Sequence, residues 1–182
     1  MAQQPVDPNL SEGERHLETG AWAEAEAAFR RAIEAAPTSA VAFSKLGVAL
    51  ARQRRMDEAE QAFSKAVALN PRYAPAWSNL GNVYRESGRT DEALQAYERA
   101  VAADPDYWIA HQNLGGLYKQ MGRTSEAIAA LKRATRLSIK APIRRPGGAG
   151  GQRSGCLGRT AVFLFLIGAG AAIGAGAAIL IL

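Results

Sequence analysis

The hydrophobic pattern of the first 141 residues repeats every 34 residues. Five columns of this pattern keep one kind of residue, namely glycine, alanine in two columns, a large apolar residue, and proline, and chance does not align five columns. The columns are Gly13, Gly47, Gly81 and Gly115; Ala25, Ala59, Ala93 and Ala127; Ala32, Ala66, Ala100 and Ala134; Phe29, Phe63, Tyr97 and Leu131; and Pro37, Pro71 and Pro105. A period of this length predicts a fold of stacked repeating units.

Each unit is predicted to contain two helices, and the third unit shows why. Its first apolar residues are spaced i, i+3, i+4 and i+7, as on one face of a helix: Trp77, Leu80, Gly81 and Tyr84. Residues 86–89 break this helix. Asp91 and Glu92 then begin a second helix, whose N-terminal dipole favours acidic residues, and Pro105 ends it.

This pattern resembles the tetratricopeptide repeat family, whose consensus is W-x2-L-G-x2-Y, then A-x3-F, then P. The third unit matches with Trp77, Leu80, Gly81, Tyr84, Ala93, Tyr97 and Pro105, and the second with Phe43, Leu46, Gly47, Leu50, Ala59, Phe63 and Pro71. The fourth unit has His111 in the aromatic column and Ile139 in the proline column, which leaves its last helix boundary open. The first has Glu12 in the leucine column, as expected of an end repeat that faces water.

The resemblance implies an all-α fold, an α-solenoid of four helix-turn-helix repeats. We expect a short N-terminal tail at residues 1–5 and the repeats at 6–39, 40–73, 74–107 and 108–141. A flexible basic, Gly-rich linker is expected at 142–159, and a transmembrane helix at 160–182.

The membrane helix is predicted from the 22 uncharged residues Ala161–Leu182, which span about 33 Å as a helix, enough for a bilayer core of about 30 Å. A capping helix over the last repeat is the alternative, but it would need a polar face, which this segment lacks. No acidic residue follows Glu126, while eight basic residues precede the segment: Lys132, Arg133, Arg136, Lys140, Arg144, Arg145, Arg153 and Arg159. By the positive-inside rule, the repeats face the cytoplasm of a single-pass, tail-anchored protein.

Within this segment, Gly170 and Gly174 form a GxxxG spacing that would allow a homodimer through the membrane helix; a helix merely rich in Gly and Ala is the alternative. Cys156 is a candidate for palmitoylation or an inert thiol.

The N-terminus lacks a signal-peptide pattern. Arg outnumbers Lys 17 to 5, which favours a GC-rich bacterium and its inner membrane over a eukaryotic organelle membrane.

Charge and composition exclude several classes of function. Residues 1–141 hold 18 of the 22 basic and all 17 acidic residues, so the repeats are nearly neutral and nucleic acid is not predicted as a partner. Cys156, the one cysteine, excludes a disulfide framework. GxxxxGK[ST], HExxH, CxxC and GxSxG motifs are absent, and His16 and His111 fall in helix-packing columns. We predict no enzyme, no cofactor and no metal site.

In the family the first helix of each repeat lines a concave groove that binds a peptide or helix. The matching residues here are Lys45, Arg52, Asn79, Asn82, Arg85, Glu86, Asn113, Lys119 and Gln120. Asn79 and Asn113, one repeat apart, are expected to pair with a peptide backbone, or else to be solvated surface residues. The carboxylate clamp of one family subtype is absent, because Leu10, Glu14, Pro75 and Ile109 occupy its positions.

The sequence therefore predicts a membrane-anchored protein-interaction scaffold or adaptor. The alternative is an assembly or regulatory subunit of a membrane complex for secretion, envelope biogenesis or organelle division, docking through the last repeat and the membrane helix. In that case Ile128, Leu131 and Leu137 would face the neighbouring subunit. A third interpretation, a fragment of a larger enzyme, is disfavoured by Met1 and the terminal apolar segment.

Overall fold

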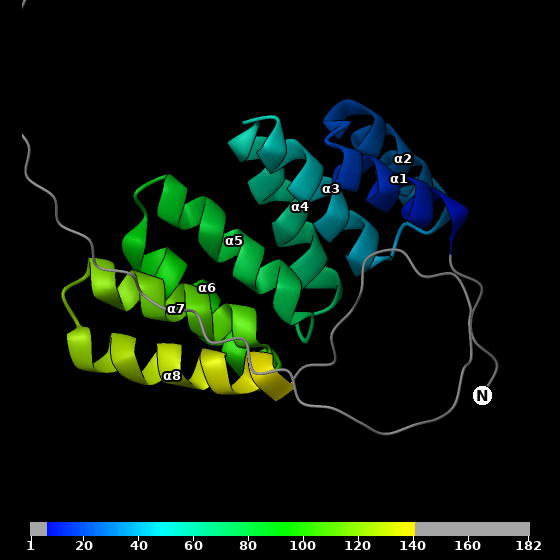
Figure 1. Ribbon diagram of the computed structural model, residues 1–182. Helices are drawn as coiled ribbons and strands as arrows, with labels where there is room; N and C mark the ends of the chain where they lie inside the picture. The colour runs from blue at the N-terminus through cyan, green and yellow to red at the C-terminus, as the bar shows by residue number, and fades with distance from the viewer. Residues whose placement is uncertain (1–6, 141–182) are drawn as a thin grey trace, which may run out of the picture. The chain divides into compact units, whose positions relative to one another are not determined.

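A computed structural model describes residues 7–140 of the chain, which form eight α-helices in four consecutive hairpins (Figure 1). The helices are α1 Pro8–Thr19, α2 Trp22–Ala35, α3 Ala40–Arg52, α4 Met56–Leu69, α5 Ala74–Glu86, α6 Thr90–Ala103, α7 Trp108–Gln120 and α8 Thr124–Lys140. Each helix packs on its neighbours along the chain, and α1, α3, α5 and α7 also contact one another in succession. The α-solenoid expected from the repeat is therefore present.

The recurring columns of the repeat hold each hairpin together. Phe63 and Tyr97 are fully buried, and each ring lies against the glycine of its own hairpin. A methyl group at Gly81 would come within 2.6 Å of Cε1 of Tyr97, and one at Gly47 within 2.7 Å of Cε1 of Phe63. The ring can occupy this place only because glycine leaves room for it, so the glycine and aromatic columns are one packing device.

The proline column sets the length of the second helices. Helices α2, α4 and α6 have 14 residues each and end two residues before Pro37, Pro71 and Pro105. Proline lacks an N–H and disfavours helical backbone in the residue before it, so the helix ends there. In the fourth unit Ile139 replaces proline, and α8 continues for 17 residues to Lys140.

His111 takes over the role of the aromatic residue that it replaces. In the third unit, Trp77 donates its Nε1–H to the carbonyl of Pro71 at 2.9 Å. In the fourth, Nε2 of His111 lies 2.9 Å from the carbonyl oxygen of Pro105, one repeat further on. Because a carbonyl oxygen can only accept, Nε2 carries the proton. The hydrogen bond gives His111 a structural role.

Among residues 7–140, no helix combines the length and the apolar character needed to cross a bilayer. The predicted linker, the predicted membrane helix with Gly170 and Gly174, Cys156 and the N-terminal tail all lie outside the described residues.

Candidate peptide-binding groove

A pocket of about 500 Å³ opens beside α3 and α5. Its lining comes from the start of α2, the end of α3 with the turn that follows, α4 and α5: Trp22, Val48, Ala51, Arg52, Arg54, Met56, Phe63, Asn79, Asn82, Val83, Arg85 and Glu86. Six of these residues are apolar and six are polar or charged, so the pocket offers both apolar contact area and hydrogen-bonding groups. Five of the predicted groove residues meet here, namely Arg52, Asn79, Asn82, Arg85 and Glu86.

The two asparagines of the pocket differ in their partners. Oδ1 of Asn82 accepts a hydrogen bond of 2.7 Å from the hydroxyl of Tyr97, which leaves the amide N–H groups of Asn82 as donors. The side chain of Asn79 makes no hydrogen bond to any other residue between 7 and 140. Asn79 therefore retains both donor and acceptor capacity toward a ligand.

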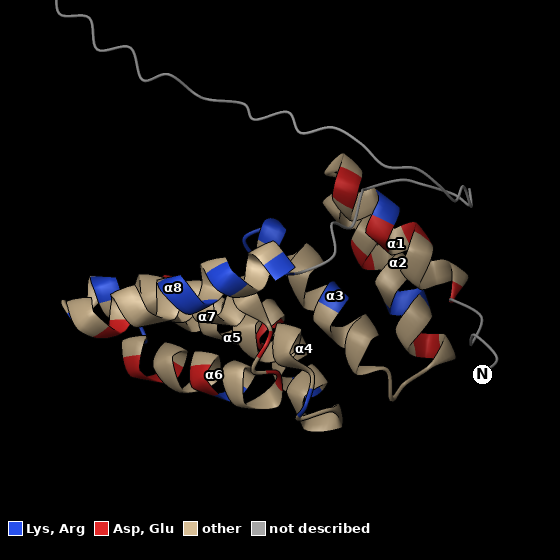
Figure 2. Cartoon of the chain, turned by 60° about the horizontal axis from the view of Figure 1, so that its bottom comes forward, with Lys and Arg blue, Asp and Glu red and all other residues tan. Residues whose placement is uncertain are grey.

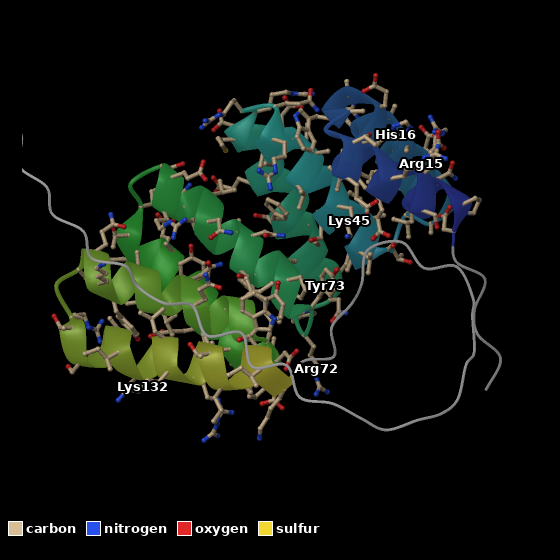
Figure 3. All side chains as sticks on the ribbon, in the orientation of Figure 1. Arg15, His16, Lys45, Arg72, Tyr73 and Lys132 are labelled. Carbon is tan, nitrogen blue, oxygen red and sulfur yellow. The ribbon has the colours of Figure 1, made fainter. Side chains whose placement is uncertain are left out.

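The remaining predicted groove residues lie elsewhere. Nζ of Lys45 forms an ion pair of 2.8 Å with Glu14 of α1, and Figure 3 shows Lys45 on α3 on the same side of the molecule as Tyr73. Burial and the nearby carboxylate of Glu14 raise the pKa of Tyr73 above its ordinary value. Lys119 and Gln120 are exposed at the end of α7.

Asn113 differs from Asn79 in having a hydrogen-bond partner within the fold. Its Nδ2 donates a hydrogen bond of 3.0 Å to Oγ of Ser78, a buried residue of α5. Because a buried hydroxyl needs such a partner, the amide of Asn113 serves the packing of α7 on α5. Asn79 and Asn113 occupy the same column of the repeat, but of the two only Asn79 lines the pocket.

Three arginines give the pocket its positive charge. Arg52, Arg54 and Arg85 line it, and within the described residues none of them forms an ion pair. The guanidinium of Arg52 lies over the ring of Trp22, 5.7 Å from its centroid. Glu86 is the one carboxylate of the lining. Arg54 and Trp22 also line the pocket but were not predicted, because they belong to a turn and to a second helix rather than to the first helices.

Other arginines form a regular ladder between repeats. Arg55, the residue before α4, bonds to Glu58 of α4 and, at 2.7 Å, to Glu26 of the preceding repeat. One repeat on, Arg89 does the same with Glu92 and Glu60. The repeat spacing of these residues could have revealed the ladder in the sequence.

Glu26 is the most enclosed acid of the ladder, with 5% of its surface exposed. Burial opposes ionisation of its carboxyl, but hydrogen bonds from Gln53 and Arg55 outweigh that effect, and the pKa of Glu26 lies below its ordinary value. Ion pairs thus join the first and second repeats across their interface.

A second surface lies on α8. Ile128 is 49% exposed, Leu131 38% and Ile139 79%. Lys132 and Arg136 flank them, and Figure 2 shows blue basic residues along α8. Figure 3 shows the side chain of Lys132 pointing away from α7. The expected apolar face is thus present, except that Leu137 is half-buried and Ile139 takes its place.

The fold and the groove define a helical-repeat protein of the α-solenoid class. A family model described as tetratricopeptide repeat matches residues 38–106 and 73–140, which together are more than half of the chain. The chain belongs to the tetratricopeptide repeat family.

Solved structures agree with this assignment. A crystal structure of MamA is 31% identical, covers 72% of this chain and 77% of its own, and superposes with a TM-score of 0.63. PilF of Pseudomonas aeruginosa is 27% identical, covers 73% of this chain and 61% of its own, and has a TM-score of 0.67. No curated protein matches the chain.

Proposed function

We propose that this protein is a non-catalytic interaction scaffold that binds a peptide segment of a protein partner in the pocket beside α3 and α5. The observation that carries the proposal is the combination, in one pocket, of three arginines and an asparagine that have no ion pair or side-chain hydrogen bond to any residue between 7 and 140. An amide that is free to donate and accept can pair with a peptide backbone, and apolar lining residues such as Met56 supply contact area.

Co-purification from native membranes tests whether a protein partner binds in this pocket. Replacing Asn79 and Arg85 by alanine removes two polar groups of the pocket, and we expect the partner to be lost. Lys119 and Gln120, which are groove-column residues outside the pocket, supply the matched control: their double alanine variant is expected to keep the partner. A partner that survives the Asn79 and Arg85 changes contradicts the proposal.

We further propose that the scaffold is held at a membrane by residues 160–182, with the repeats in the cytoplasm, in a bacterial inner membrane rather than that of an organelle. The support is the uncharged segment and the basic residues before it. Gly170 and Gly174 would let two such helices approach closely. The full chain should remain in the membrane fraction after alkaline carbonate extraction, and a chain cut after Lys140 should be released. Release of both would contradict anchoring.

The exposed face of α8 supports a second candidate function, docking onto a subunit of a membrane complex. An amphipathic helix with acidic flanks would complement Ile128, Leu131 and Ile139 together with Lys132 and Arg136. If docking occurs here, Leu131→Asp should abolish co-purification of the complex, whereas Asn79→Ala should not. The opposite pattern favours the pocket.

A further inference from the structure

The turn between α3 and α4 departs from the other turns of its type. The other three hairpins have glycine at the turn, with φ of 76° at Gly20 and 74° at both Gly88 and Gly122. Arg54 occupies the equivalent position, 34 residues after Gly20, and has φ of 66°. It is the one residue other than glycine with a left-handed backbone among residues 7–140. A side chain with a Cβ is strained in this conformation.

The turn itself does not require an arginine. In all four hairpins, the N–H of the residue that follows the left-handed position donates to a carbonyl five residues earlier: Ala21 to His16 at 2.9 Å, Arg55 to Leu50 at 3.1 Å, Arg89 to Tyr84 at 2.9 Å and Arg123 to Tyr118 at 2.8 Å. This is the usual helix ending that favours glycine. Since the backbone is the same in each case, glycine would serve at position 54 as well.

The side chain of Arg54 does not offset this strain through contacts within the fold. Within the described residues it makes neither an ion pair nor a hydrogen bond, unlike its neighbour Arg55. What it does is line the pocket together with Arg52 and Arg85. Three guanidinium groups around one pocket repel one another, and the carboxylate of Glu86 can balance only one of them. An anionic ligand would remove this repulsion.

We propose that Arg54 is a ligand-binding residue and that, with Arg52 and Arg85, it selects an acidic peptide segment. Guanidinium groups bind carboxylates through paired, charge-assisted hydrogen bonds. In this arrangement Asn79 binds the peptide backbone, while the arginines bind Asp or Glu side chains or a C-terminal carboxylate. The inference rests on the proposed function, because it names the chemistry of the segment that the same pocket takes.

The probe is a library of random peptides displayed on phage and selected on the immobilised full chain in detergent. We expect the selected peptides to be enriched in Asp and Glu relative to the input library. The same selection on Arg54→Gly should yield peptides without this enrichment, and an acidic peptide from the first selection should bind Arg54→Gly roughly tenfold more weakly.

Two variants separate charge from folding. Arg54→Lys keeps the charge and should retain most of the preference for acidic peptides. Arg72→Gln removes an exposed charge outside the pocket and should leave the selection unchanged. The direction of the change in melting temperature is an independent test. Because Arg54→Gly relieves the strained backbone, this variant should melt at a higher temperature than the parent while it binds acidic peptides less well. Weaker binding accompanied by a lower melting temperature would contradict the inference.

The remaining outcomes distinguish the two proposals. If peptides are selected but show no preference for acidic residues, the pocket binds peptides and the inference about Arg54 is wrong. If both chains enrich acidic peptides equally, Arg54 is not the selecting residue. If neither chain selects any peptide, the proposed function of the pocket fails, and the inference fails with it.

Discussion

The third and fourth repeats share the same columns but bury them differently. Tyr97 of α6 has none of its surface exposed, whereas Leu131, its counterpart in α8, is 38% exposed. The difference arises from the next helix along the chain, since α6 is followed by α7, while the described residues end with α8. A hairpin is thus specified by its own sequence, but its full burial depends on the repeat that follows.

The sharpest test of this comparison is to truncate both side chains. Tyr97→Ala should lower the free energy of unfolding by about 3–5 kcal/mol, because it leaves a cavity and removes the partner of Asn82. Leu131→Ala should cost less than about 2 kcal/mol, since part of the side chain is already in water. Urea unfolding of the full chain, followed by circular dichroism, measures both. Equal losses would contradict the comparison.

The glycine column provides a second contrast. A methyl group at Gly81 meets the enclosed ring of Tyr97, and Gly81→Ala should cost about 1–3 kcal/mol. At Gly115 the added carbon would lie 2.7 Å from Cγ of Leu131 and 3.3 Å from the backbone oxygen of Ala127, but Leu131 is 38% exposed and its side chain can shift toward solvent. Alanine is also the better helix former by about 1 kcal/mol. Gly115→Ala should therefore change the melting temperature much less than Gly81→Ala; the reverse order would show that α8 is held as rigidly as α6.

The arginine ladder is also incomplete in the last repeat. Arg89 bonds to Glu60 of the preceding repeat, but Arg123 has Leu94 at the matching place and bonds only to Glu126 among the acids of the described residues. Arg89→Gln should lower the melting temperature more than Arg123→Gln does. The side chains of Arg89 and Arg123 are 38% and 39% exposed, so water screens these ion pairs, and the difference should be small and should shrink in high salt.

The same ladder predicts a dependence of stability on pH. Because the pKa of Glu26 is depressed in the folded chain, its contribution is present above the unfolded pKa of about 4.3 and is lost as the pH falls through the folded value. Glu26→Gln should flatten the fall in stability below about pH 4.5. Ile128, at the matching position of α8, has no ionisable group. Ile128→Gln should therefore leave the dependence of stability on pH unchanged. Parallel acid titrations of the melting temperature compare the two variants.

The sequence predicts the fold well because the 34-residue columns are themselves the packing contacts. The ring of Tyr97 fits against α5 only because residue 81 has no side chain, so the glycine and the aromatic residue recur together at a fixed spacing. Without a proline at Ile139 the sequence does not predict where α8 ends, and the helix runs through this position to Lys140, the last described residue.

The candidate site was harder to predict, because column membership does not reveal hydrogen-bond partners. Asn79 and Asn113 look equivalent in the sequence, yet Asn113 is bonded to the buried Ser78. Arg54 stands in the glycine column of the turns, and the 34-residue register marks it as an exception. Whether Arg54 lines a pocket depends on how α3 and α5 pack against each other, and a local sequence pattern does not reveal that packing.

The most direct test of the account is photo-crosslinking of the full chain in native membranes from two positions. A diazirine analogue replaces Met56, which lines the pocket, or Leu131, on the open face of α8. We predict a crosslinked partner from position 56 that disappears when Arg54 is changed to glycine, with no loss of folded protein. A partner crosslinked from position 131 alone, and unaffected by Arg54→Gly, would contradict it.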